Sequence, residues 1–443
     1  MDRRNIIITV AIFLLVVLLL WLGVRMLKNN PGDTVGTATS TVSLFPTGEV
    51  RPDGVGQGSL FDNLATSTAS NPNLSTDELP PAERTGRFYR ISNRPIGGAV
   101  QLSQNVATSS VGNLIYVEKS TGHLFRLAGT AVTPERISNT TIPKIYNLAA
   151  GQTGTTTHII FQYLKNNQVQ TFLGHLSLPT TVTGEAFLNT SNSDSSNPDA
   201  EPIAGALLAN NISSLAVAPT QDKLLLLETA PNNLATNAIL LDLKSNKRET
   251  LTTLPLAEWR AAWATSSILT LQTSAASNHL GSLYWYNLKT KKLELVITSV
   301  PGLTTLTSPK VDKIFYSGQV DNKLVAGFYS PSQKFFSRLN LQTWADKCVW
   351  TRDGKTLYCA APSSLPPGDY PDTWYRGEAS VSDNLWKIDP ATGKSELIYN
   401  PTLGQTGLQI DAEKLTLASD ESTLYLTNRQ DGNLWALSLT GSF

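Results

Sequence analysis

The sequence is poor in the residues that usually build metal and catalytic centres. Among 443 residues there are only two cysteines and four histidines, and the cysteines do not form a Cys-x-x-Cys pair. No two histidines have the close spacing of a zinc or iron site. Gly-x-Ser-x-Gly, His-Glu-x-x-His and glycine-rich phosphate motifs are also missing. The sequence therefore predicts no catalytic residue, no metal site and no cofactor.

Charge is also scarce, and it is balanced. Charged residues make up 16% of the chain, against roughly 25% in a typical soluble domain. The 35 lysines and arginines equal the 35 aspartates and glutamates in number, so the formal net charge is zero. A protein that binds nucleic acid needs a basic surface for the phosphates. We therefore expect no nucleic-acid partner.

One long apolar run stands near the N-terminus. Residues 6–24 are nineteen in number and carry no charge. As a helix they would extend about 28 Å, close to the ~30 Å hydrocarbon core of a bilayer. The alternative is a cleaved signal peptide, whose apolar core is usually shorter and is followed by a small-x-small site that is not found here. We therefore expect residues 1–30 to hold an uncleaved transmembrane anchor.

The orientation of this anchor rests on composition. Positive charges flank the apolar run on both sides, so the positive-inside rule nearly balances. The weakly charged remainder, rich in threonine, serine and asparagine, is typical of extracytoplasmic proteins. We expect the N-terminus inside the cytoplasmic membrane and the rest of the chain in the periplasm or at the cell surface. Residues 31–86 are expected to be a flexible linker, since they cannot bury enough apolar surface to offset their ordering entropy.

From residue 87 to residue 443 the sequence consists of short apolar runs, many of them alternating, separated by turn residues. This pattern is typical of an all-β domain. Arg-Ile-Ser-Asn at residues 90–93 recurs at residues 136–139. Apolar strands that end at a turn residue also return at intervals near 50, a period typical of four-stranded propeller blades. These turn residues are Asn287, Asn340, Asp389 and Ser438.

Residues 350–358 strengthen this interpretation. Their sequence, W-T-R-D-G-K-T-L-Y, resembles the W-x-x-D-G-K-x-L-aromatic hairpin of the TolB-like and WD-repeat-like β-propeller superfamily. The resemblance extends from about residue 88 to residue 443 and implies the architecture, not a function. The Trp-Asp and Gly-His pairs of typical WD repeats are not in place. The chain also resembles uncharacterised membrane-anchored bacterial propeller proteins, which implies a bacterial source.

The units can be counted. They begin near residues 99, 145, 212, 258, 303, 344 and 409, and the last has only three clear strands. The first strand, at residues 88–91, has no partner before it. Both facts predict a seven-bladed β-propeller whose N-terminal strand completes the last sheet, which removes the unpaired edges of the ring. Six or eight blades are the alternatives.

The two cysteines, Cys348 and Cys359, flank an expected turn at Asp353 and Gly354. If these are the two central turn residues, the cysteines lie directly opposite each other in a hydrogen-bonded pair. A three-residue turn would instead put them on opposite faces of the hairpin. An oxidising compartment favours a disulfide. A disulfide and two packed thiols both stay open.

One expected loop, residues 362–384, is far longer than a hairpin turn. Loops on one face of a propeller usually carry its binding sites. This loop contains residue types that dominate interface hot spots, and the candidate partner-binding residues are Tyr370, Trp374, Tyr375 and Arg376. In the alternative interpretation, the aromatic side chains fold back as a plug over the central channel.

Charged residues near the expected first strands are candidates for the channel wall. They are Glu258, Arg260, Asp346, Lys347 and Asp411. Such a ring of mixed charge serves either catalysis or a salt-bridged lining. We expect a protein-binding or scaffolding module tethered in the cell envelope, with an envelope protein as its partner. The alternative is an enzyme or glycan-binding domain that uses the channel. The sequence does not indicate the oligomeric state.

Overall fold

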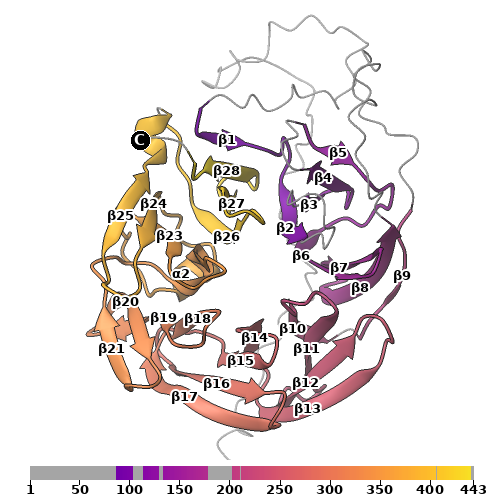
Figure 1. The fold of residues 1–443 in the computed structure, drawn as a ribbon, viewed down its shortest axis with the longest axis horizontal. Helices are drawn as coiled ribbons and strands as arrows, with labels where there is room; N and C mark the ends of the chain where they lie inside the picture. The colour runs from indigo at the N-terminus through magenta and orange to yellow at the C-terminus, as the bar shows by residue number, and fades with distance from the viewer. Residues whose placement is uncertain are drawn as a thin grey trace, which may run out of the picture. The chain divides into compact units, whose positions relative to one another are not determined.

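The computed structural model describes residues 86–102, 113–128, 133–177, 202–209, 211–405 and 407–440. Within these residues, which belong to the compact unit Ser75–Phe443, the strands form seven four-stranded antiparallel sheets in a ring (Figure 1). The predicted seven-bladed β-propeller is thus confirmed. The expected anchor and nearly all of the expected linker lie outside the described residues. None of the helices within them is long and apolar enough to cross a membrane.

The blades follow one another around the ring, with the first strand of each blade nearest the centre (Figure 1). Blade 1 consists of β2 (Ile96–Leu102), β3 (Asn113–Glu118), β4 (Leu124–Ala128) and β5 (Glu135–Arg136). Blade 2 consists of β6 (Ile145–Thr153), β7 (Thr156–Lys165), β8 (Gln168–Ser177) and β9 (Ala204–Leu207). Blade 3 consists of β10 (Ile212–Val217), β11 (Lys223–Thr229), β12 (Ala235–Asp242) and β13 (Arg248–Pro255). Blade 4 consists of β14 (Trp259–Trp263), β15 (Ile268–Thr273), β16 (Leu280–Asn287) and β17 (Lys292–Pro301). Blade 5 consists of β18 (Thr304–Thr307), β19 (Ile314–Val320), β20 (Lys323–Ser330) and β21 (Phe335–Arg338). Blade 6 consists of β22 (Cys348–Trp350), β23 (Leu357–Pro362), β24 (Asp383–Ile388) and β25 (Ser395–Tyr399). The short helices are η2 (Ala345–Lys347), α2 (Asp372–Tyr375) and α3 (Pro401–Gly404).

Blade 7 combines the two ends of the described chain. Its first three strands are β26 (Ala412–Leu417), β27 (Thr423–Asn428) and β28 (Leu434–Ser438), and its outer strand is β1 (Phe88–Arg90). β1 runs antiparallel to β28, with Phe88 opposite Leu437. The Phe88 ring also stacks on Trp435 at a centroid distance of 5.1 Å.

The repeated Arg-Ile-Ser-Asn segment marks the fourth strand of a blade. In blade 7 the Ser92 hydroxyl accepts a hydrogen bond from the backbone N–H of Leu434 at 2.9 Å. In blade 1 the Ser138 hydroxyl accepts one from the N–H of Leu124 at 3.0 Å. Both serines are buried, and each bonds the first residue of the third strand. The serine of the repeat therefore joins the third strand of its blade to the fourth by a hydrogen bond.

Each blade is an antiparallel meander, so its connections lie on two faces of the ring. One face carries the connections from the second strand to the third and those from one blade to the next, and we name it the loop face. On the opposite face, the side chains of Asp242, Asn287 and Asp389 at third-strand ends accept backbone N–H groups of the turn at 2.8 to 3.2 Å, as in Asx turns. The assignment of Asn340 to this series was wrong, because Asn340 follows the fourth strand β21.

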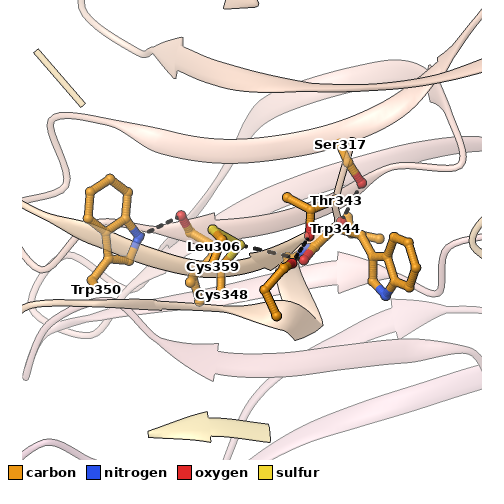
Figure 2. The surroundings of a disulfide bond; sticks show 10 residues. Leu306, Ser317, Thr343, Trp344, Cys348, Trp350 and Cys359 are labelled. Carbon is orange, nitrogen blue, oxygen red and sulfur yellow. Dashed lines mark hydrogen bonds between the residues drawn. A yellow bond between two sulfur atoms is a disulfide. The ribbon is translucent and has the colours of Figure 1, made fainter. Parts of the chain in front are cut away.

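The core lies between neighbouring blades. Residues 224–227 of β11 are all 0% exposed, because a second strand is covered on both faces by the adjacent sheets and therefore reads as an uninterrupted apolar run. Tryptophans add polar contacts between blades. The Trp350 indole N–H donates to the Leu306 carbonyl of the preceding blade at 3.1 Å (Figure 2), as Trp263 does to Ala216 at 3.0 Å. The tryptophan of the W-x-x-D-G-K hairpin thus has a structural role.

Candidate functional site

The long loop between β23 and β24 carries α2, which projects toward the centre of the ring (Figure 1). We name residues 363–382 the plug. Tyr370 and Trp374 are each only 3% exposed, and Gln319 of blade 5 donates a hydrogen bond to the Tyr370 carbonyl oxygen. A partner cannot contact these two aromatic side chains while the plug holds this conformation. The structure thus corresponds to the plug interpretation for Tyr370 and Trp374.

The plug also forms hydrogen bonds with blades 4 and 7. In blade 4, the Ser277 backbone N–H donates to Asp372 Oδ2 at 2.5 Å. In blade 7, Arg429 Nη1 donates to the Trp374 carbonyl oxygen at 2.9 Å, and its guanidinium stacks 4.0 Å from the indole. The exposed Arg376 forms an ion pair within the plug, with Glu378 at 2.6 Å.

A buried ammonium group lies beneath the plug. Lys347 of η2 is 0% exposed, and its Nζ lies 2.6 Å from Asp383 Oδ2 and 2.8 Å from Asp411 Oδ1. It also donates to the Ala412 carbonyl oxygen at 2.9 Å, while the Trp374 indole N–H donates to Asp411 at 2.8 Å. Burial raises the pKa of Asp383, and the Lys347 charge opposes that rise. The structure buries Asp411, a predicted channel residue, in this cluster instead of on the channel wall.

A second charged group lies between the plug and the channel. Arg260 Nη1 lies 2.7 Å from Asp346 Oδ1, and the Tyr375 hydroxyl donates to Asp346 Oδ2 at 2.6 Å. Burial has the largest single effect on Arg260 and lowers its pKa, but Asp346 and Tyr375 together raise the pKa overall. Burial, followed by the Asp346 charge, raises the pKa of Tyr375. The tyrosine therefore stays a neutral donor, and the group is a satisfied ion pair.

Two adjoining cavities occupy the channel beside the plug. One of about 520 Å³ is lined by blades 2, 3, 4 and 7, including Glu258. The other, of about 440 Å³, is lined by α2 and by blades 4, 6 and 7, including Asp346. Both contain Arg260, Glu413 and Lys414 in their walls. Each volume falls in the range of roughly 300–1,000 Å³ typical of ligand pockets.

Three residues of this channel were missed by the sequence analysis: Glu413, Lys414 and Arg429. Strand alternation predicts that neighbours such as Glu413 and Lys414 face opposite sides of a sheet. A β-bulge between Glu413 and Thr416 breaks that alternation, and Lys414 has a φ of 53°. Nothing in the local sequence marks this bulge. In the described part of the chain, no group of three or more His, Cys, Asp or Glu residues could hold a metal ion.

The structure joins Cys348 and Cys359 by a disulfide across the first hairpin of blade 6 (Figure 2). The two residues are direct partners in the register, but the expected hydrogen-bonded pairing was wrong. The Cys348 N–H bonds to Ala345 instead of Cys359, and the Cα atoms are 4.1 Å apart, near the ~4.5 Å of a non-hydrogen-bonded pair. The turn is longer than expected, because its closing bond joins Thr351 N–H to the Thr356 carbonyl at 2.9 Å.

No protein-family model matches the sequence, and no curated protein is significantly similar to it. Among solved structures, the oligogalacturonate lyase from Vibrio parahaemolyticus is similar with a TM-score of 0.49 and 9% identity, over 80% of this chain and 94% of that one. The tricorn protease has a TM-score of 0.45 and 10% identity over 81% of this chain, which spans only 34% of that protein. The beta-propeller domain of the Trilobed protease from Pyrococcus furiosus has a TM-score of 0.42 and 10% identity, over 68% and 83% of the two chains. Likeness at this level carries no inference about function.

Proposed function

We propose that this protein is a binding module of the cell envelope that holds a protein partner on the loop face of its propeller. The apolar run at residues 6–24 supports a membrane anchor, and the weakly charged composition supports a propeller outside the cytoplasm. The observation that carries the binding role is a set of exposed leucines on the loop face.

These leucines, which we name the leucine arc, lie where blades 2, 3 and 4 reach the loop face. Each stands beside a connection from a second to a third strand or from one blade to the next. Leu234 and Leu256 are neighbours, since the N–H of Leu256 donates to the Leu234 carbonyl at 2.9 Å. The arc consists of Leu164, Leu207, Leu234, Leu256 and Leu280, which are 46% to 66% exposed.

The arc favours a protein partner for an energetic reason. Full burial of an exposed leucine contributes about 1.5–3 kcal/mol, so five half-exposed leucines would contribute on the order of 5 kcal/mol on binding. An enzyme in the channel has weaker support. The carboxylates of Asp346 and Asp411 are held in ion pairs with Arg260 and Lys347, so neither is placed as a free general acid or base.

The test replaces three arc residues by asparagine, in the variant Leu234→Asn/Leu256→Asn/Leu280→Asn. Proteins cross-linked in intact cells are then co-purified with the full-length chain and quantified by mass spectrometry. We expect a specific envelope protein to be captured by the native chain and to fall at least tenfold with the variant. Equal capture by both chains would refute the arc as the binding surface.

A matched control carries the same substitution at three leucines on the outer strands β17 and β25. Leu293, Leu295 and Leu397 are 40% to 49% exposed, so the control changes surface polarity by a similar amount away from the loop face. We expect it to capture the partner as the native chain does. Protease added to intact or spheroplasted cells tests the location separately, because it digests the propeller only if the propeller lies outside the cytoplasm.

A further inference from the structure

Lys414 connects blade 7 to blades 1 and 2. It lies at the bulge in β26 of blade 7, where its positive φ of 53° turns the side chain out of the regular alternation. Its Nζ donates to the Tyr146 carbonyl of blade 2 at 2.7 Å and to the Gly97 carbonyl of blade 1 at 3.1 Å. An ammonium group has three N–H donors, so one donor stays available. Lys414 lines both cavities.

The charges around the smaller cavity, of about 440 Å³, do not balance. Its wall holds three cations and two carboxylates, a net charge of +1. Arg260 is paired with Asp346 at 2.7 Å, and Arg429 lies 3.6 Å from Glu413. Among the described ion pairs, none engages Lys414, whose hydrogen bonds go to carbonyl dipoles. The excess positive charge of this cavity therefore resides on Lys414.

The surroundings of Lys414 increase its demand for a counter-ion. The Lys414 side chain is exposed to the channel, and the protein atoms around it lower its pKa through desolvation, which Glu413 only partly opposes. An anion beside the ammonium would stabilise its charged form. Glu258 offers a carboxylate in the wall of the larger cavity. The two cavities thus present a cation near the plug and an anion toward blades 3 and 4.

We propose that the channel binds a ligand that presents a carboxylate to Lys414, with a hydrogen-bonding or cationic group toward Glu258. The chemistry fits the C-terminal residue of a peptide and a free amino acid equally. The site goes beyond the proposed function, because it requires no partner on the leucine arc. Failure of one proposal therefore leaves the other standing.

The test measures binding to the purified full-length protein by the fluorescence of Trp259 and Trp374, which line the two cavities. The probes are acetyl-trialanine with a free carboxylate, its C-terminal amide, and free alanine. We expect saturable binding of a free carboxylate and at least tenfold weaker binding of the amide. Binding of the tripeptide alone would identify a peptide end, and equal binding of alanine would identify a small amino acid. Binding of none of the probes, or equal binding of acid and amide, would overturn the proposal.

Lys414→Met, which keeps the length of the side chain and removes its charge, should weaken carboxylate binding at least tenfold. The control Lys355→Met lies on the opposite face, where Lys355 is 76% exposed, and should bind normally. If Lys414→Met does not fold, the native protein supplies the test. Its affinity for the acid must fall as the pH rises through the pKa of Lys414, and an affinity independent of pH up to the denaturation limit would contradict the proposal.

Discussion

Replacing Lys347 by methionine should destabilise the propeller by about 3–5 kcal/mol, the usual result of removing one partner from a buried ion pair. The ammonium lies between Asp383 and Asp411 with no exposure to water. Without it, the two carboxylates face each other in the core. Burial raises the pKa of Asp383, and loss of the Lys347 charge that opposes this rise favours its protonated form further. Asp411, which also accepts the Trp374 indole N–H, loses its ion-pair partner.

The loss has two parts that a second variant separates. One part is the unpaired buried charge, and the other is the set of lost hydrogen bonds. In Lys347→Met/Asp383→Asn/Asp411→Asn no charge is left unpaired. We therefore expect the triple variant to recover at least half of the lost free energy of unfolding, since neutral replacements of buried ion pairs are often well tolerated.

The assay is urea unfolding of the full-length protein followed by tryptophan fluorescence. Lys387→Met serves as the control, because Lys387 is an exposed residue of the same blade and its substitution should change stability by less than about 0.5 kcal/mol. A loss below about 1 kcal/mol for Lys347→Met, typical of a surface pair, would refute the reasoning. So would a triple variant as unstable as the single one.

Three further predictions concern stability. Ser92→Ala should lower the free energy of unfolding by about 1 kcal/mol, because the N–H that Ser92 accepts is buried; the exposed Ser266→Ala is the control, and equal urea midpoints would contradict the prediction. Reduction of the Cys348–Cys359 disulfide should lower the free energy of unfolding by about 3 kcal/mol, since the bond closes a loop with a sequence separation of 11. An unchanged urea midpoint in a sample with two titratable thiols would show that the bond does not constrain the unfolded chain. Burial, followed by repulsion from a neighbouring histidine, lowers the pKa of His158 below its usual 6.5. The unfolded state then binds the proton first, so stability is present above about pH 6.5 and is lost as the pH falls below it; His158→Gln should flatten this slope, and an unaltered slope would assign it to another group.

The architecture could be predicted because its signals are local. The run at residues 224–227 is apolar at every position because a second strand is buried on both faces. Asp242 and Asn287 mark third-strand ends because their side chains form the turn themselves. The number of blades follows from the repeated sets of strands, whereas the Asx turns described above mark blades 3, 4 and 6.

The site could be predicted only in part, because its contacts join distant segments. Lys347 and Asp411 stand 64 residues apart, and no local pattern pairs them. Arg260 and Asp346 were candidates for the channel as individual charges, but their pairing depends on the closed ring. The bulge at Lys414 shifts the register of β26 and changes which face its side chains take, and sequence periodicity does not resolve such a shift. The longer turn between Thr351 and Thr356 keeps Cys348 opposite Cys359 but makes them a non-hydrogen-bonded pair.

The strand order of blade 7 limits when this blade can form during synthesis. Phe88 in β1 pairs with Leu437 in β28, so the first of the described strands to be synthesised pairs with the last of them. At a synthesis rate of roughly 5–20 residues per second, the intervening ~350 residues take about 20–70 s. Blades 1 to 6 gain their strands one after another during this time, whereas the partner of β1 is synthesised last. The native sheet of blade 7, and with it the closed ring, therefore cannot form before β28 has been synthesised.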